Sequence, residues 1–286
     1  MIKSVLFLLA FFGILQGSAQ NLEDLLTEEE KAGTEAIDNV FMGTRLVNAQ
    51  SANPVEKGTL ILLIQHRFGD ISGGAYEFFG LDQAEMRLGF EYGVAKGLAL
   101  GIGRSTFQKT YDAFVKAGIA KQSSSFPFAT TFTASGYITT MKNYFMEPHD
   151  GFSDKMASYL ELEIVRNFKG ISVQISPAYM FTGFVPEAGE SRSFPVVTGA
   201  LSLAVSKRVN INMEYTHHFS DMLPGNNRPL SIGADIDTGG HLFQLVLSNT
   251  QGMTEQGIYK RSTGDWTTGN IFFGFNLIRN FYLKQP

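Results

Sequence analysis

Most of this chain alternates bulky apolar residues with polar or small ones, in segments of roughly nine to eleven residues, the length that a tilted strand needs to cross a bilayer. The stretch EMRLGFEY over residues 85–92 is typical. Because successive side chains of a strand point to opposite faces, this pattern predicts strands with one apolar and one polar face. Such strands build either a soluble sandwich, whose apolar face forms a core, or a membrane barrel, whose apolar face meets lipid.

The N-terminus predicts export. Residues 1–19 combine a positive Lys3, an apolar run over residues 5–15 and the small residues GSA before a cleavage point after Ala19. These are the features of a secretory signal peptide, and the apolar run is too short to span a bilayer as a helix. The chain has no cysteine, so we expect neither a lipid anchor on cysteine nor a disulfide. The expected destination is the periplasm, the outer membrane or the medium.

Composition narrows the class further. The net charge of −4 argues against a nucleic-acid partner. No later apolar run reaches the roughly eighteen residues of a membrane helix. Charged residues make up 17% of the chain, whereas glycine (30) and phenylalanine (25) are abundant. A closed sheet in lipid fits this composition.

We divide the chain into a signal peptide (1–19), a periplasmic N-terminal segment (20–57) and one antiparallel all-β transmembrane barrel (58–286). The barrel should have about twelve strands, within a range of ten to fourteen that suits outer-membrane barrels. The predicted spans are 58–68, 83–93, 97–106, 109–119, 126–136, 156–166, 171–181, 195–205, 209–219, 229–237, 241–249 and 270–279.

The connections between these spans predict the orientation. Long connections (69–82, 137–155, 182–194, 250–269) alternate with short ones (94–96, 167–170, 206–208, 238–240), and the very short 107–108 is the exception. Outer-membrane barrels have short periplasmic turns and longer outer loops. We therefore expect the outer membrane of a Gram-negative bacterium, with both termini in the periplasm. A soluble sandwich would give no reason for one-sided loop lengths.

The polar phase of the strands supplies the candidate lumen. Its members can form an electronegative pore lining or a carboxylate–guanidinium network that fills a narrow barrel. A barrel of about twelve strands lies between the filled eight-stranded type and the open sixteen-stranded type, so both interpretations stay open. The predicted pore-lining residues are Arg67, Glu85, Arg87, Glu91, Asp112, Glu161, Glu163, Glu214 and Asp235.

The stretch 36–57 has no clean period and carries a basic residue, Arg45, just before an acidic lumen. One hypothesis is that it folds back into the periplasmic mouth as a partial plug, with Arg45 paired to a lumen carboxylate. The alternative is a disordered tether.

Two further patterns suggest chemistry. Asp235, Asp237 and His241 have oxygen and nitrogen ligands for a divalent cation, but acidic residues before Gly239 are also ordinary turn residues. The stretch HHFSD over residues 217–221 contains hydrolase residue types, yet neighbouring strand residues point apart and do not make a triad. We expect no metal site, no cofactor and no enzymatic activity.

Several motifs carry a family resemblance: FMGTRLVN (41–48), QHRFG (65–69), FGLDQA (79–84), TGGHLFQL (238–245) and SNTQGM (248–253). From about residue 38 onward, the chain resembles a family of Bacteroidota outer-membrane β-barrel proteins grouped as a domain of unknown function. The resemblance extends over a stretch far longer than the roughly 100–150 residues of a typical domain. The resemblance implies the barrel fold and the outer membrane, and it implies no activity.

The leading functional hypothesis is a passive, porin-like channel or transporter for a small hydrophilic solute. The alternative is a non-conducting barrel that anchors or docks partners through its long outer loops, and a third hypothesis is an outer-membrane lipid hydrolase. The expected partners are outer-membrane lipid, a small hydrophilic solute and a periplasmic or surface protein.

Overall fold

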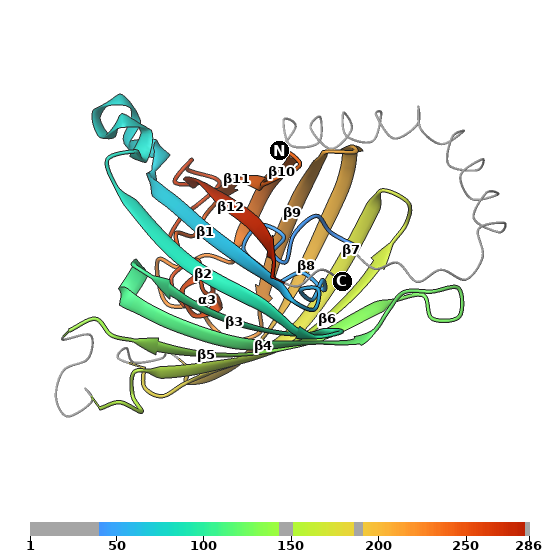
Figure 1. Ribbon diagram of the computed structural model, residues 1–286. Coiled ribbons are helices and arrows are strands. Elements are labelled where there is room, and N and C mark those ends of the chain that lie inside the picture. Colours follow the sequence, from blue (N-terminus) through green and yellow to red (C-terminus); the bar gives the residue numbers. More distant parts are fainter. Residues whose placement is uncertain (1–39, 143–150, 186–190, 284–286) are drawn as a thin grey trace.

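The computed structural model describes residues 40–142, 151–185 and 191–283. The predicted signal peptide and residues 20–39 lie outside the described residues. The chain forms a closed antiparallel barrel of twelve strands, in which each strand pairs with its neighbours in sequence and β1 pairs with β12 (Figure 1). The predicted fold class is confirmed.

The strand bounds agree closely with the predicted spans. The main difference is β5, which begins at Ala129 rather than at 126, because Phe126 belongs to a turn in which its carbonyl accepts a hydrogen bond from the Ser123 amide. The elements are β1 (Thr59–Asp70), η2 (Ile71–Gly80), β2 (Ala84–Ala95), β3 (Leu98–Ser105), η3 (Phe107–Lys109), β4 (Thr110–Ala120), β5 (Ala129–Thr139), β6 (Met156–Asn167), β7 (Ile171–Thr182), β8 (Ser193–Ser206), β9 (Val209–His218), β10 (Leu230–Asp237), β11 (Leu242–Ser248), α3 (Glu255–Lys260) and β12 (Phe272–Tyr282).

Alternation along the strands separates two faces. In β6, Leu160 is 42% exposed on the outside while its neighbour Glu161 is 1% exposed on the inside. The same exposed apolar belt includes Ile102 on β3 and Leu245 on β11. A continuous apolar surface of this kind is unfavourable in water and marks the face that meets lipid. Among the described residues, no helix is both long and apolar enough to cross a membrane.

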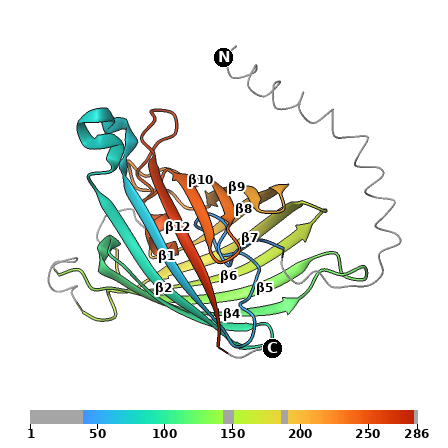
Figure 2. The ribbon, with the colours of Figure 1, turned by 45° about the horizontal axis from the view of Figure 1, so that its top comes forward.

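The two ends of the barrel differ. The end where β1 begins and β12 ends, here called the terminal end, carries the tight turns between β2 and β3, β6 and β7, β8 and β9, and β10 and β11. The opposite end, here called the far end, carries longer connections, except for the short one through η3 between β3 and β4. It also carries the short helix η2, which projects beyond the strands (Figures 1 and 2).

Two segments occupy the lumen. Residues 40–55, here called the N-terminal plug, lie inside the ring of strands next to the start of β1 (Figures 1 and 2). Residues 249–264, here called the inner loop, belong to the connection between β11 and β12 and bring α3 inside from the far end. The end of the N-terminal plug and the residue after it approach the wall closely at Gly93, where a Cβ atom would overlap the carbonyls of Val55 and Glu56. Glycine is therefore needed at that point of β2.

Candidate functional site

The N-terminal plug is a compact hairpin. The Leu46 amide donates a hydrogen bond to the Ala49 carbonyl (3.0 Å), and the Ser51 amide donates to the Thr44 carbonyl (3.0 Å). The side chain of Asn53 closes its base by donating from Nδ2 to the Phe41 carbonyl (2.7 Å). The segment thus has internal hydrogen bonds besides those that it makes with the barrel.

Glu214 on β9 holds the tip of this hairpin. Its carboxylate accepts hydrogen bonds from three successive backbone amides, those of Val47 (3.3 Å), Asn48 (2.9 Å) and Ala49 (3.0 Å). Successive amides that converge in this way form a concave site for an anion. One wall carboxylate therefore satisfies three buried amides, through bonds that its charge strengthens.

Other wall side chains donate hydrogen bonds to further backbone carbonyls of the N-terminal plug. Buried carbonyls need donors as strictly as amides need acceptors. The wall therefore recognises the plug largely through its main chain. The donors are Lys116 Nζ to the carbonyls of Thr44 (3.2 Å) and Ser51 (3.1 Å), Gln174 Nε2 to Gln50 (2.8 Å), Gln244 Nε2 to Leu46 (2.8 Å), Asn276 Nδ2 to Val47 (3.1 Å) and Thr131 Oγ1 to Ala52 (2.6 Å).

Arg45 joins the N-terminal plug to the inner loop. Its Nη1 lies 2.8 Å from Glu255 Oε1, and the two side chains are 1% and 3% exposed. Gln50 Nε2 donates to the same oxygen (3.3 Å), and the Tyr137 hydroxyl donates to Oε2 (2.7 Å). Burial alone would raise the pKa of Glu255, but Arg45 and the Tyr137 hydrogen bond outweigh it and hold that pKa below its ordinary value.

Arg45 pairs with a carboxylate that the sequence interpretation did not name. The hypothesis gave a lumen carboxylate as its partner, and the ion pair is with Glu255 of α3, which is not among the predicted pore-lining residues. Glu91 and Asp112 of the wall act on Arg45 only as further negative charges nearby. The reason is that the connection between β11 and β12 folds into the lumen and places Glu255 of α3 there. Local sequence patterns do not reveal this.

Arg87 and Asp112 form a second buried ion pair. The contact is bidentate, with Arg87 Nε 2.9 Å from Oδ1 and Nη2 2.5 Å from Oδ2, and Arg87 Nη1 donates to Gln65 Oε1 (3.0 Å). A Cβ atom at Gly103 would overlap the guanidinium. The pair lies flat against the wall, where bidentate geometry makes it strong.

Three other predicted pore-lining residues also have protein partners. Arg67 donates from Nη2 to Asn48 Oδ1 of the N-terminal plug (2.8 Å) and from Nη1 to Asn276 Oδ1 (2.9 Å). Asp235 accepts from Gln244 Nε2 (2.9 Å). Glu85 lies nearer the far rim, is partly exposed, and accepts a hydrogen bond from the Thr106 hydroxyl.

The last predicted residues, Glu91, Glu161 and Glu163, are deeply buried. Glu163 accepts from the Thr133 hydroxyl (2.5 Å). Within the described part of the chain, neither carboxylate oxygen of Glu91 or Glu161 has a hydrogen-bond partner. A buried carboxylate without partners is costly. The ammonium of Lys116, which attracts all three, is instead bonded to carbonyls of the N-terminal plug.

An apolar cluster lies in the far half of the lumen between β5–β8 and the inner loop, and the sequence interpretation missed it. Ile258 and Tyr259 of the inner loop pack against lumen-facing side chains, and the hydroxyls of Tyr259 and Tyr159 lie 3.2 Å apart. A signal was present, because Tyr159 stands in phase with Glu161 and Glu163 on β6. The other members of this cluster are Tyr137, Ala157, Met180, Phe194 and Val196.

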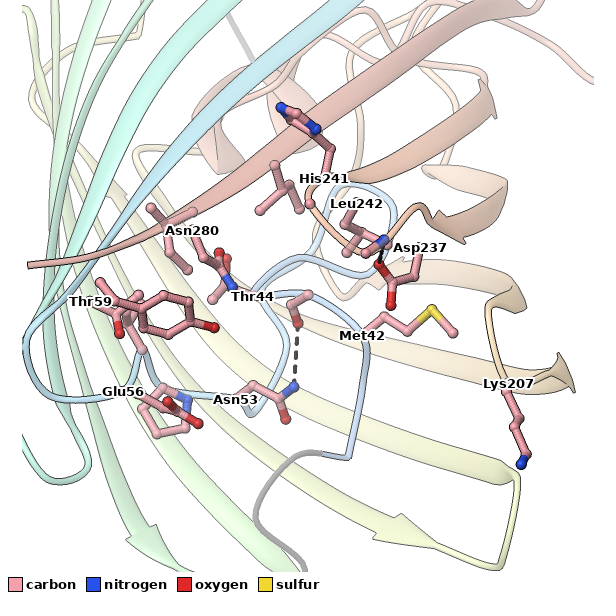
Figure 3. Close-up of a pocket in the computed structure, with 18 residues that line it drawn as sticks. Met42, Thr44, Asn53, Glu56, Thr59, Lys207, Asp237, His241, Leu242 and Asn280 are labelled. Atoms are coloured by element: carbon pink, nitrogen blue, oxygen red, sulfur yellow. Dashed lines mark hydrogen bonds between the residues drawn. The ribbon is translucent and has the colours of Figure 1, made fainter. Parts of the chain in front are cut away.

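A cavity of about 460 Å³ remains at the terminal end, between the N-terminal plug and the wall. Figure 3 shows Asn53 and Glu56 on one side of it and Asp237 and Leu242 on the other. Its lining is mixed, since apolar side chains such as Ile278 lie beside these polar groups. The plug therefore does not fill this mouth beside β1 and β10–β12.

The other chemical patterns do not assemble into sites. His218 points into the lumen and stacks on Phe194 (ring centroids 5.4 Å apart), whereas its neighbour His217 lies against Phe219. His241 Nε2 lies 3.1 Å from Arg279 Nη1. Within residues 40–142, 151–185 and 191–283, no three His, Asp or Glu side chains converge as ligands for a metal ion.

Known proteins resemble this chain in sequence or in fold. The model of a family described as "Membrane bound beta barrel domain (DUF5777)" matches residues 41–281. A solved structure titled as the NanC porin has a TM-score of 0.50 at 10% identity, covering 78% of this chain and 98% of that one. The outer membrane protein Omp33 of Acinetobacter baumannii has a TM-score of 0.40 at 8% identity, covering 79% and 99%. No curated protein sequence matches significantly.

Proposed function

Because the chain belongs to the family of membrane-bound beta barrel domains, we propose that it is an outer-membrane barrel closed at rest rather than an open diffusion pore. One observation carries this proposal: wall side chains bind the main chain of the N-terminal plug inside the lumen, where the plug meets the inner loop. The barrel then serves to hold the plug and the far-end loops in the membrane, where they dock a periplasmic or surface protein.

The orientation in this proposal places the terminal end in the periplasm. The tight turns at the terminal end and the long connections at the far end support it, because outer-membrane barrels have short periplasmic turns. The N-terminal plug would then be accessible from the periplasm. The far-end connections, including η2, would face the medium.

The energetics favour a closed state. A buried hydrogen bond contributes about 1 kcal/mol net, and removing one partner of a buried ion pair costs about 3–5 kcal/mol. Displacing the N-terminal plug breaks many of the former and separates Arg45 from Glu255. Spontaneous opening should therefore be rare.

Conductance in a planar bilayer tests this proposal. The full protein should show no steady open channel, whereas a variant lacking residues 21–52 should conduct. A matched variant lacking residues 21–39 keeps the described plug and should behave like the full protein. A steady open conductance from the full protein would refute the closed resting state.

A second function is favoured by the cavity at the terminal end, which gives the plug room to move. The barrel would then be a gated channel for a small hydrophilic solute. Once the plug leaves, the wall residues now buried around it become exposed, and carboxylates outnumber basic side chains among them. The open state should therefore prefer cationic solutes. The buried wall charges are Glu91, Asp112, Glu161, Glu163, Glu214 and Asp235 against Arg67, Arg87 and Lys116.

The reversal potential of the variant lacking residues 21–52, measured across a KCl gradient, distinguishes this channel from an unselective hole. Cation preference supports the gated channel.

We assign no enzymatic role, since His217 and His218 point to opposite faces of β9.

A further inference from the structure

We propose that the inner loop and the N-terminal plug are coupled through Glu255, so that a partner which withdraws the inner loop at the far end releases the plug at the terminal end. The barrel would thereby transmit a binding event across the membrane. This inference rests on the closed barrel proposed above and adds how its closure is regulated.

The first step of the argument is where the two segments meet. They enter the lumen from opposite ends, and one carboxylate oxygen of Glu255 accepts hydrogen bonds from both Arg45 and Gln50 of the N-terminal plug. The same carboxylate is held on its other oxygen by Tyr137 of the wall. Glu255 is thus the residue through which the inner loop supports the plug.

The second step is how the far-end surface reaches the inner loop. The Asn227 amide donates to the Ser262 carbonyl (2.6 Å), and Asn226 Nδ2 donates to the Lys260 carbonyl (3.1 Å). Both asparagines belong to the connection between β9 and β10, at the far end. A partner that binds and moves this connection therefore pulls on the segment that carries Glu255.

The third step is what the plug loses. Without Glu255, Arg45 stays buried while the Asp112 carboxylate remains engaged by Arg87. A buried cation that loses its ion pair and keeps only the more distant charges of Glu91 and Asp112 is unfavourable, so the plug is destabilised. Coupling between two docked segments is reciprocal, so loss of Arg45 should also loosen the inner loop. That reciprocity gives the proposal a second, independent test.

The experiment uses the absence of cysteine in the chain. One reporter, Ala52→Cys, lies in the N-terminal plug, and another, Ser262→Cys, lies in the inner loop, and both native side chains are buried. The purified full protein in lipid vesicles is labelled with a maleimide, and the rate of modification measures opening. Native barrel content is checked by circular dichroism.

Glu255→Gln should speed labelling at position 52 at least tenfold, and Arg45→Met should speed labelling at position 262 by a similar factor. When both substitutions are combined, the labelling rate at either position should stay below the product of the two single effects at that position, because both remove the same ion pair. The matched control is Asp265→Asn, which should change neither rate. Its carboxylate lies just beyond the inner loop and accepts hydrogen bonds from its own turn, at Thr267 and Thr268.

Equal labelling at position 52 with and without Glu255→Gln would overturn the coupling, as would acceleration at only one of the two positions. If Glu255→Gln does not fold, Glu255→Asp shortens the same side chain by one methylene and should still accelerate both reporters. A full protein that conducts steadily but shows reciprocal labelling would refute closure and keep the coupling. A full protein that does not conduct and shows no reciprocal labelling would support the closed resting state and refute the coupling.

Discussion

Replacing Glu214 with alanine should release the tip of the N-terminal plug and leave the barrel intact. The carboxylate accepts hydrogen bonds from the backbone amides of Val47, Asn48 and Ala49, and the substitution removes the acceptor of all three. Each buried amide left unsatisfied costs about 1–3 kcal/mol. Relief from burying the carboxylate offsets part of this cost. We therefore expect docking of the plug to weaken by about 3 kcal/mol, roughly a hundredfold.

Maleimide labelling of an Ala52→Cys reporter measures this change, because opening exposes the thiol. Glu214→Ala should raise the labelling rate about a hundredfold where opening and closing are fast. The control is Thr216→Val, two residues further along the same face of β9, which bonds to Thr198 of the wall. An unchanged rate in Glu214→Ala would refute the view that this carboxylate holds the hairpin tip.

Three other predictions follow from the same structure. Leu245→Arg on the lipid face should make refolding into vesicles less favourable by about 2–4 kcal/mol if it lies near the midplane; a penalty no larger than that of Leu245→Ala would contradict the face assignment. A cysteine at Asn227 should label in intact cells with an impermeant maleimide, whereas one at Gly239 should label only after lysis; the reverse pattern would overturn the orientation. The pKa of Glu255 lies below its ordinary value, so its carboxylate stabilises the closed state at neutral pH and that contribution is lost as the pH falls below about 4. Maleimide reacts with the thiolate, so the labelling rate at position 52 is normalised to that of a free thiol at the same pH. This normalised rate should rise at low pH, and the part of the rise absent from Glu255→Gln reports this group, which faces Arg45, Gln50 and Tyr137.

The sequence by itself determined the class of structure and the face of each strand residue. On β6, Leu160 and Leu162 alternate with Glu161 and Glu163, and the pleat of a strand turns that order directly into outside and inside. Loop lengths likewise reveal which connections share an end. These properties are local, because each depends on residues within one strand or one turn.

Only the tertiary structure decided what fills the lumen. Residues 40–55 have no period to interpret, and their main chain is bound by side chains from strands across the whole barrel. Arg45 pairs with Glu255, which stands 210 positions later in the chain. Closure of the barrel between β1 and β12 brings such distant groups together, and the energy of their contacts depends on burial that no short pattern encodes.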